Sequence, residues 1–576
     1  MSSNSLDLLR PGIHLEGQQH SQRQTRVIGI ASMIWGASIL LSRVMGLVRE
    51  QIIGRTLGAS RQADLYFASF TLPDFLNYLL AAGALSIVFI PIFVAHLQRG
   101  DNARAWTSFS IIANFIVLIC MFGIAVLMIF ARPLAALVAP GIVDPSEFDT
   151  LVRLTRIVLP AQLFHIVGGL LSAALMAQNL HTLPALAPLV YSAGIIAGGL
   201  VGIVYPDLGA EGFAWGVLIG SIAGPFAMPL YGCIKSEMRW LPLLPVKDPD
   251  LRRYLWLSVP IMIGFSIVIV DEWIVKNQAS YLAAGNLAHL QYGRTLMKVP
   301  IGMFGMALGV ASYPTISELV TTGAVVRAYA LLCRAMRLML LLTFAAQVCL
   351  TVAGFEAVYL IWGLAAHRFS LADAQDTATV MAFLCIGLSG WAAQTLISRG
   401  FYALGSTWLP TLVGTAIAIL MTPAYVMLRE RGGAIGLAIA SSAAIVLYVM
   451  VLGWLQRRRF EREAAIRGTA LDESEGMLRV TLLLAVAAVI AIGLGLLARF
   501  ELLLWLPGVD AGTVLARATI LCTTSLCVYI ATIWLFRVHE LEEIQALLWR
   551  TFRPKHTTGA PATDEDQAQA GQRQTN

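Results

Sequence analysis

Residues 42–93 read SRVMGLVREQIIGRTLGAS over 42–60 and, after Arg61, QADLYFASFTLPDFLNYLLAAGALSIVFIPIF over 62–93. The two apolar runs here are long enough to cross a bilayer, since a transmembrane helix needs about 20 apolar residues. They nevertheless contain arginines, carboxylates and two prolines. In lipid, such breaks are tolerated where neighbouring helices or water satisfy the freed backbone groups. The stretch therefore predicts a bundle of several membrane-spanning helices around a polar cavity.

The composition of the whole chain is typical of a membrane protein. The 576 residues are 57% hydrophobic and 13% charged, with a mean hydropathy of +0.73, whereas soluble domains carry about 25% charged residues. This composition excludes a soluble enzyme. The net charge of +6 does not imply a nucleic-acid partner, because the Lys and Arg of membrane proteins gather in cytoplasmic loops. The seven cysteines lie scattered in apolar runs, so we expect neither disulfides nor a metal site.

Apolar stretches separated by short polar connections continue to the C-terminal part of the chain. We expect an all-α, polytopic membrane protein with fourteen transmembrane helices and no cleaved signal peptide. The fourteen predicted spans lie near 27–48, 64–96, 104–131, 152–178, 184–204, 210–234, 251–281, 286–318, 329–362, 377–404, 407–428, 433–456, 477–499 and 514–537.

An internal similarity relates span 2 to span 8. LYFASFTLP (65–73) with GALSIVFIPIFVAHLQRGD (83–101) resembles LQYGRTLMKVP (290–300) with MALGVASYPTISELVTTG (306–323). Because six spans separate the copies, both run in the same direction, which favours two six-helix lobes related by an axis along the membrane normal. The alternative is a chance likeness between two proline-broken helices. The predicted segments are a disordered cytoplasmic tail (1–26), an N-terminal lobe (27–240), a C-terminal lobe (241–456), a basic cytoplasmic loop (457–476), two extra helices (477–537) and a polar cytoplasmic tail (538–576).

Basic residues in the connections predict the orientation. They gather before span 1 and after spans 6, 12 and 14, which the positive-inside rule places in the cytoplasm together with both termini. Arg49, Arg55 and Arg61 depart from this rule, and the departure marks their region as a candidate for function. The 457–476 loop is either a solvated charged linker or a surface helix on anionic lipid.

Ionisable residues inside the predicted spans are the main candidates for function. A charge at the bilayer centre costs roughly 2.5–3.5 kcal/mol, and the alternative for each residue is that it reaches the membrane interface. In span 1, Arg43 and Arg49 lie about 120° apart on a straight helix, so a bend between them would direct both to one cavity; Glu50 follows. In span 2, Asp74 is either a helix cap after a proline or an ion partner of these arginines.

Spans 7 and 8 carry a second set of charges. Glu272 and Lys276 have the favourable i,i+4 order for a pair within one helix; alternatively, Asp271 or Glu272 faces a cavity as a proton or cation site. Arg294 and Lys298 lie a turn apart on one helical face. Two like charges there predict an anion or a water-filled lumen opposite them.

A cavity lined by Arg43, Arg49, Arg294 and Lys298 suits a phosphate or diphosphate group, because guanidinium forks match phosphate oxygens and Lys acts as a point charge. Such a cavity suits a hydrophobic cation poorly. The sequence contains no Walker A motif. The energy for transport is therefore expected from an ion gradient, the membrane potential or a partner, without a cofactor.

Several blocks of the chain resemble one family of membrane proteins. The stretch over 42–93 is very similar to the N-terminal signature of the MurJ (MviN) lipid II flippases of bacteria. Further similar blocks follow in the family's order: VAPG (138–141), LTRIVLP (154–160), NLHTLPALAPLVYS (179–192), ASYLAAGNLAHLQYGRTLMKVPIGMFGMALGVASYPTIS (279–317) and SRGFYALGSTWLP (398–410).

The resemblance implies a fold and a function. The family belongs to the multidrug/oligosaccharidyl-lipid/polysaccharide exporter superfamily, with fourteen helices, two six-helix lobes and a lipid-tail groove at helices 13 and 14. It implies a flippase, not an enzyme, that moves lipid II across the bacterial inner membrane by alternating access. By position, Arg43, Arg49, Glu50, Asp64 and Arg294 match family residues that line the inward-facing cavity and contact the pyrophosphate and sugar.

The chain also departs from the family pattern. Asn77, Tyr78 and Ala82 stand where other members have a basic pair and an acid, and Lys298 replaces an acid. Alternative functions are therefore a flippase for another polyprenyl-linked oligosaccharide and a non-transporting scaffold for cell-wall synthesis. The expected partners are a lipid-linked oligosaccharide, membrane lipid and proteins of peptidoglycan synthesis. The predicted substrate-binding residues are Arg43, Arg49, Asp64, Asn77, Arg294 and Lys298, and the candidates for ion coupling or ion pairing are Glu50, Asp74, Asp271 and Glu272.

Overall fold

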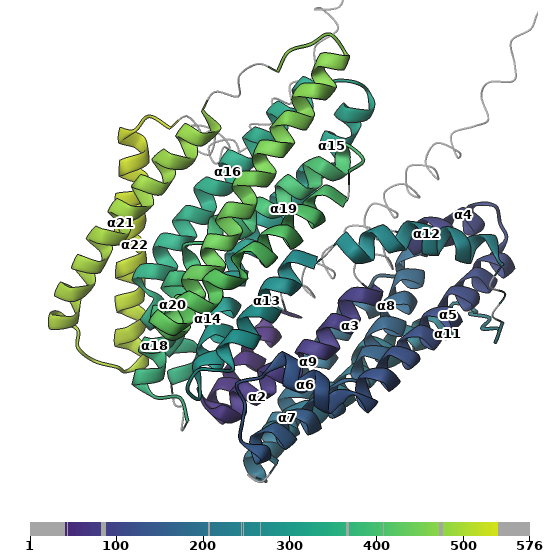
Figure 1. Ribbon diagram of the computed structural model, residues 1–576, viewed down its shortest axis with the longest axis horizontal. Coiled ribbons are helices and arrows are strands. Elements are labelled where there is room, and N and C mark those ends of the chain that lie inside the picture. The colour runs from purple at the N-terminus through teal and green to yellow at the C-terminus, as the bar shows by residue number, and fades with distance from the viewer. Residues whose placement is uncertain are drawn as a thin grey trace, which may run out of the picture.

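The computed structural model describes residues 41–538 apart from 43, 82–87, 206–207, 244, 246, 265, 365–367, 407 and 472–475. The predicted N-terminal tail, Arg43, Ala82 and the segment beyond 538 lie outside this part of the chain. The described residues form helices joined by turns and short connections (Figure 1). The prediction of an all-α membrane protein is confirmed.

The first half of the chain forms a helix over 44–57 and then a bundle that we call the N-terminal bundle. Its elements are α2 (Arg61–Ser69), α3 (Thr71–Ala81), α4 (Ile90–Gln98), α5 (Asn102–Ile129), α6 (Ala131–Val138), α7 (Pro145–Val158), α8 (Ala161–Ala177), α9 (Thr182–Val204), α10 (Gly209–Ser221), the π-helical η3 (Ile222–Ala227) and α11 (Met228–Lys235).

The second half begins with α12 (Pro249–Gly264), followed by the C-terminal bundle and a final helical pair. The C-terminal bundle consists of α13 (Ser266–Ala279), α14 (Asn286–Pro300), the π-helical η4 (Ile301–Met306), α15 (Ala307–Thr321), α16 (Val325–Val352), α17 (Gly354–Val358), the π-helical η5 (Tyr359–Gly363), α18 (Leu371–Cys385), α19 (Leu388–Ala403) and α20 (Trp408–Ile466). The final pair is α21 (Met477–Trp505) and α22 (Ala511–Leu535).

Many of these helices are long and apolar enough to cross a membrane. Among the described residues, nine helices meet this criterion, or ten when the bent pair α18 and α19 counts as one span. The helix α20 is counted once, although it joins two helices across Gly433, whose backbone is non-helical (φ 55°, ψ −131°). The predicted apolar stretches from 104 to 234 and from 286 to 537 fall on these helices. The described residues of the stretches 64–96 and 251–281 instead form the shorter helices α2 to α4 and α12 to α13, and the number fourteen stays a prediction.

Glycines hold α9 and α10 in backbone contact. A Cβ atom added at Gly198 would lie 2.2 Å from the Gly212 carbonyl oxygen, and one at Gly216 would lie 2.6 Å from that of Gly194. Small residues let membrane helices approach closely, so that van der Waals packing holds them together. The close contact makes these two helices a tight unit within the N-terminal bundle.

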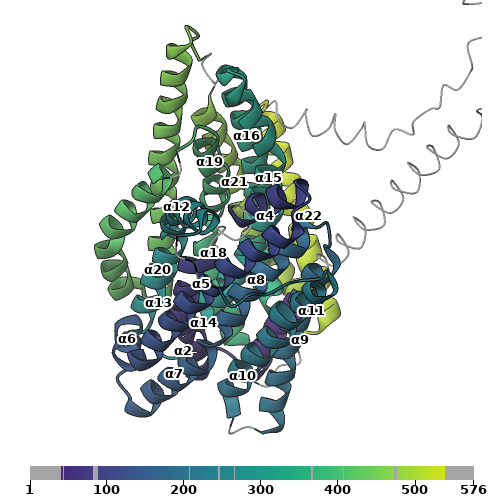
Figure 2. The same ribbon diagram turned by 90° about the vertical axis from the view of Figure 1, so that its right-hand side faces the viewer.

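The two bundles lie side by side and are closest where α2, α3 and α6 meet α13 and α14 (Figure 1). Between their other ends, α12 crosses from α20 to α3 and α5 (Figure 2). The Arg104 guanidinium of α5 fixes the start of α12, since it lies 2.8 Å from the carboxylates of both Asp248 and Asp250. The helix α12, which forms the start of predicted span 7, therefore packs on both bundles.

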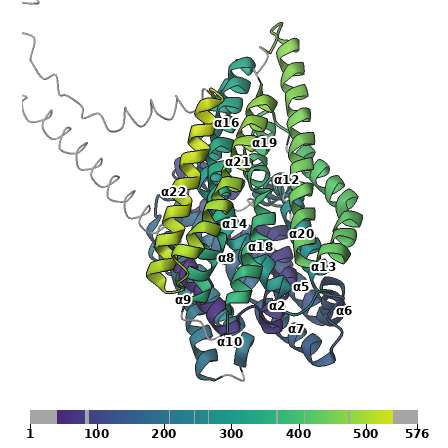
Figure 3. The same ribbon diagram turned by 90° about the vertical axis from the view of Figure 1, so that its left-hand side faces the viewer.

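The final pair, α21 and α22, packs along α16 on the outer side of the C-terminal bundle (Figure 3). Glu356 of α17 is fully buried and lies 2.8 Å from the Arg517 guanidinium of α22 and 3.6 Å from that of Arg499 on α21. Arg517 also donates a hydrogen bond of 2.9 Å to the Leu506 carbonyl between the two helices. A buried ion cluster thus attaches this pair to the C-terminal bundle.

Candidate functional site

Asp64 joins the two bundles at the end where they are closest. Its carboxylate accepts hydrogen bonds from the backbone N–H groups of Gly285 (2.7 Å) and Ala288 (2.8 Å), and only 2% of the residue is exposed. These N–H groups belong to the start of α14, where helical donors have no partner within the helix. Gly285 has φ +91°, a left-handed conformation that favours glycine. Asp64 of the N-terminal bundle therefore caps a helix of the C-terminal bundle.

Further contacts close the same end of the molecule. The Tyr292 hydroxyl donates to the Gly58 carbonyl (2.9 Å), and the Trp362 indole donates to the Glu50 carbonyl (2.9 Å). The Gly141 N–H donates to the Ser280 hydroxyl at 3.0 Å. We call these contacts, together with the Asp64 cap, the seal. Any conformation open at this end has to break them.

Beside the seal, a cavity of about 450 Å³ lies between the two bundles. Residues from the helix over 44–57, α2, α3, α9, α13 and α14 line it. Its charged residues are Arg49, Glu50, Asp74, Glu272, Lys276 and Lys298, and its polar neutral residues are Tyr66, Asn77, Tyr78, Tyr191 and Gln291.

The charges of this cavity are balanced and paired. The Arg49 guanidinium lies 2.8 Å from Glu50, and the Lys298 ammonium lies 2.7 Å from Glu272. Lys276 Nζ lies 4.0 Å from Asp74, the longest of the three separations. Three cations therefore face three carboxylates, so an anion that enters the cavity has to exchange places with a carboxylate.

A fourth ion pair lies away from the cavity, between α13 and α14. Arg294 donates a hydrogen bond of 2.7 Å to Asp271 and one of 3.0 Å to the Ser441 hydroxyl of α20, and both partners of the pair are buried. Ser441 and the Tyr425 hydroxyl also donate to Asp271. Buried ion pairs need such additional hydrogen bonds to offset desolvation. This pair therefore joins three helices of the C-terminal bundle.

The structure separates the predicted site residues into two groups. Arg49, Asn77, Lys298, Glu50, Asp74 and Glu272 line the cavity, together with the cation Lys276. Asp64, Asp271 and Arg294 lie outside its lining and bond to other elements. A contact between substrate and this second group stays a prediction, and Arg43 lies outside the described residues.

Some pairings differ from those that the sequence suggests. Glu272 pairs with Lys298 of α14 instead of with Lys276 on its own helix. Lys276 reaches across to Asp74. Asn77 donates a hydrogen bond of 2.7 Å to Gln162 of α8, a partner that sequence analysis missed. Tyr191 and Gln291 also line the cavity without any signal in the sequence, because neither carries charge into an apolar span.

Comparisons with known proteins agree with this architecture. The chain is 28% identical over 467 residues to the lipid II flippase MurJ of Burkholderia cenocepacia, covering 79% of this chain and 87% of that protein. It is 26% identical over 422 residues to a probable lipid II flippase MurJ of Rhizobium tropici, covering 70% and 77%.

Solved structures share the fold. A lipid II flippase MurJ in an inward closed conformation superposes with a TM-score of 0.68 at 20% identity, covering 88% of this chain and 98% of that one. An inward-facing multidrug resistance transporter of the MATE family superposes with a TM-score of 0.61 at 13% identity, covering 73% and 95%. The family model described as lipid II flippase MurJ matches residues 53–509. This chain belongs to the MurJ family of lipid II flippases.

Proposed function

We propose that this protein translocates lipid II across the bacterial inner membrane by alternating access, with both termini in the cytoplasm and without chemical change of the substrate. The observation that carries the proposal is the cavity of about 450 Å³ with paired charges between two bundles. Within the part of the chain that the structure describes, the seal, with the Asp64 cap, joins the bundles at one end of this cavity. Substrate enters from the end away from the seal and leaves after the seal opens.

The paired charges support binding of a diphosphate by exchange. At 4 Å and an effective dielectric constant of about 20, two unit charges attract by roughly 4 kcal/mol. A diphosphate carries more negative charge than one carboxylate and offers more acceptor oxygens, so it competes for Arg49 and Lys298. Lys298 is half exposed to the cavity and exchanges most easily. The sugars then meet the tyrosine and amide side chains of the lining.

Exchange also connects substrate binding with motion. A ligand shifts a conformational equilibrium only by its different affinity for the two states. Carboxylates released from Arg49 and Lys298 would be left unpaired in the sealed state, which favours rearrangement of the bundles. We propose that the membrane potential or an ion gradient drives the return, with Asp74 as the coupling carboxylate because its cation is the most distant.

Complementation tests this function. The gene is expressed in a bacterium depleted of its own lipid II flippase, either as wild type or as Arg49→Ala or Lys298→Ala. Wild type should restore growth and export of lipid II, and both variants should fail at equal expression. Arg462→Ala is the matched control, because this exposed arginine lies on the far end of α20, away from the cavity.

Two outcomes would contradict the proposal. Growth restored by both cavity variants would favour the scaffold function, since a scaffold does not need the cavity charges. A wild-type chain that is inserted and folded but does not restore lipid II export would favour transport of another polyprenyl-linked oligosaccharide. Proteins of peptidoglycan synthesis are the proposed neighbours, and co-purification from the complemented strain tests this.

A further inference from the structure

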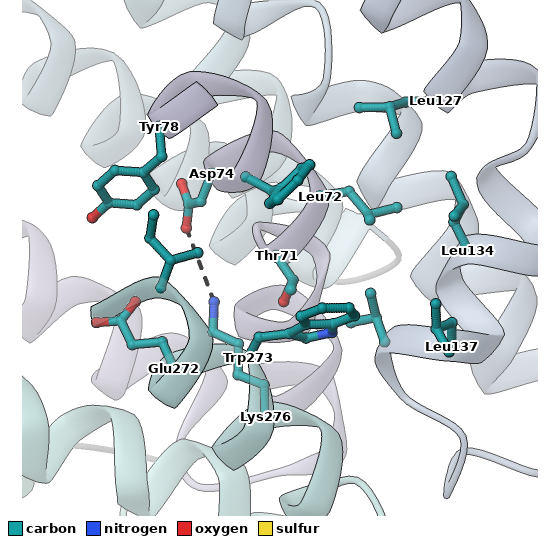
Figure 4. A pocket seen from close by; sticks show the side chains of 13 residues that line it. Thr71, Leu72, Asp74, Tyr78, Leu127, Leu134, Leu137, Glu272, Trp273 and Lys276 are labelled. Atoms are coloured by element: carbon teal, nitrogen blue, oxygen red, sulfur yellow. Dashed lines mark ion pairs between the residues drawn. The ribbon is translucent and has the colours of Figure 1, made fainter. Parts of the chain in front are cut away.

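A second, apolar pocket lies directly beside the charged cavity. It has a volume of about 160 Å³ and is formed mainly by α3, α6 and α13 (Figure 4). Leu72 of α3 lies on one side, Leu134 and Leu137 of α6 lie on the opposite side, and Trp273 of α13 lies below them. Phe75 of α3 also lines the pocket. The pocket therefore lies at a junction between the two bundles.

The pocket and the cavity share a border of four polar residues. Asp74, Tyr78, Glu272 and Lys276 line both spaces. In Figure 4 the ammonium group of Lys276 points toward Asp74, while the leucines lie on the other side of the pocket. A single molecule can thus have a charged group on one side of this border and an apolar group on the other.

The pocket also reaches the outer surface of the protein. Phe75 is 49% exposed and Leu137 is 57% exposed, although both side chains line the pocket. Leu127, another lining residue, belongs to α5, which is long and apolar enough to cross a membrane. Exposed apolar surface is typical of membrane-contacting sites, and its position beside a helix of membrane-spanning length favours an opening toward lipid.

We propose that this pocket holds the first isoprene unit of the substrate's polyprenyl chain, next to the diphosphate. The inference rests on the proposed function, since it needs a diphosphate in the cavity. A dry apolar cavity of about 150 Å³ holds a molecule as large as benzene, so 160 Å³ accommodates the five carbons of an isoprene unit. The remaining chain leaves between α3 and α6 into the lipid.

This path of the polyprenyl chain differs from the lipid-tail groove that the family resemblance implies at the last two helices. No described residue of α21 or α22 lines the cavity or the pocket. A chain that leaves through the pocket passes from the charged border directly to apolar side chains. Its apolar surface therefore passes from the diphosphate directly to apolar side chains and lipid, and little of it has to lie in the charged, water-accessible cavity.

Ligand binding by the full-length protein in lipid nanodiscs tests the pocket. One ligand is a diphosphate-linked sugar with a polyprenyl chain, and the other carries the same head with a methyl group in place of the chain. Leu137→Trp narrows the pocket at its exposed mouth. The matched control is Leu118→Trp on α5, because Leu118 is 55% exposed and lies outside the pocket lining.

The expected result is selective. Leu137→Trp should weaken binding of the polyprenyl ligand at least tenfold and leave binding of the methyl ligand unchanged, whereas Leu118→Trp should change neither. A photoreactive group on the first isoprene unit should label α3, α6 or α13. Unchanged polyprenyl binding in Leu137→Trp, equal loss of both ligands, or labelling confined to α21 and α22 would overturn the proposal.

The same measurements separate this proposal from the proposed function. If the wild-type protein binds neither ligand, the diphosphate does not occupy the cavity, and both proposals are wrong. If the wild type binds both ligands and Leu137→Trp binds them equally well, the cavity function stands and only the pocket assignment is wrong.

Discussion

Two ion pairs lie next to each other between α13 and α14, and they differ mainly in burial. Asp271 pairs with Arg294, whose side chain is 5% exposed, while the neighbouring Glu272 pairs with Lys298, whose side chain is 53% exposed to the cavity. Both contacts measure 2.7 Å. Distance alone therefore does not distinguish a structural pair from an exchangeable one.

The difference follows from the surroundings of each pair. Ser441 and Tyr425 donate to Asp271, so its carboxylate is surrounded by protein donors. Loss of one partner from such a pair leaves a charge in an apolar interior. Lys298 instead faces the open cavity, where water or an anion can replace Glu272. The comparison teaches that the buried pair holds helices together and the exposed pair is available to substrate.

The expectation that a buried ion pair holds helices together is tested most severely at another buried carboxylate, Glu356. Glu356→Gln should lower the free energy of unfolding by about 5 kcal/mol, the upper end for a broken buried pair, because Arg499 and Arg517 both lose their partner. Thermal unfolding of the purified protein measures this. A stability equal to that of wild type would show that burial does not make this cluster structural.

Asp271→Asn tests the buried member of the pair directly. We expect a loss of about 3–5 kcal/mol in unfolding free energy, since Arg294 would remain buried and unpaired. The same unfolding experiment, with Glu272→Gln as the matched variant one residue away, checks it. Equal destabilisation by the two variants would contradict the conclusion that the buried pair holds the helices together while the cavity pair does not.

Asp64→Ala tests the seal, in which a buried carboxylate accepts hydrogen bonds from two backbone N–H groups and also lies 3.6 Å from the Arg61 guanidinium. Removal of a helix cap costs about 0.5–2 kcal/mol, and 1.4 kcal/mol corresponds to a tenfold change in population. The conformation open at the seal should therefore become several-fold more populated. Distances between spin labels at the exposed Asp149 of α7 and Gln375 of α18 measure this. An unchanged distance distribution would mean that Asp64 does not hold the seal.

Glu272→Gln should have the smallest effect on stability, under about 1 kcal/mol, because its partner Lys298 is half exposed and the pair borders the open cavity, where its attraction is screened. It frees Lys298, so the affinity for a diphosphate-linked sugar should rise several-fold and fall again with added salt. Lys298→Gln should lower the affinity at similar stability. Titration of each variant in nanodiscs at two salt concentrations is the measurement. Equal affinities in the three proteins would refute exchange at this pair.

Much of the fold was predictable, because long apolar runs of low charge form helices in lipid. The stretches at 104–131, 184–204 and 477–499 coincide with α5, α9 and α21 within a few residues. Hydropathy does not show how helices pack, however. It therefore did not show that α12 contacts both bundles, or that α21 and α22 are attached through Glu356.

The candidate site was predictable in its residue types but not in its partners. The sequence shows that Asp271 and Glu272 are adjacent, and adjacent residues on a helix point about 100° apart. Which of them faces the cavity depends on the rotation of α13 about its axis, which only packing sets. Asp64 was expected to contact substrate, yet the backbone groups that donate hydrogen bonds to it lie more than 220 residues away in the chain, at 285 and 288. Local patterns carry no information about that distance.

The glycine contacts of α9 and α10 have a consequence for the transport cycle. Backbones that touch at Gly198 and Gly212 cannot slide past each other without a steric clash. During each turnover these two helices must therefore move together as one rigid body. The rotation then takes place where this pair joins the neighbouring helices. A bulky side chain in the glycine interface would push the two helices apart and hinder transport, although the interface lies away from the bound lipid.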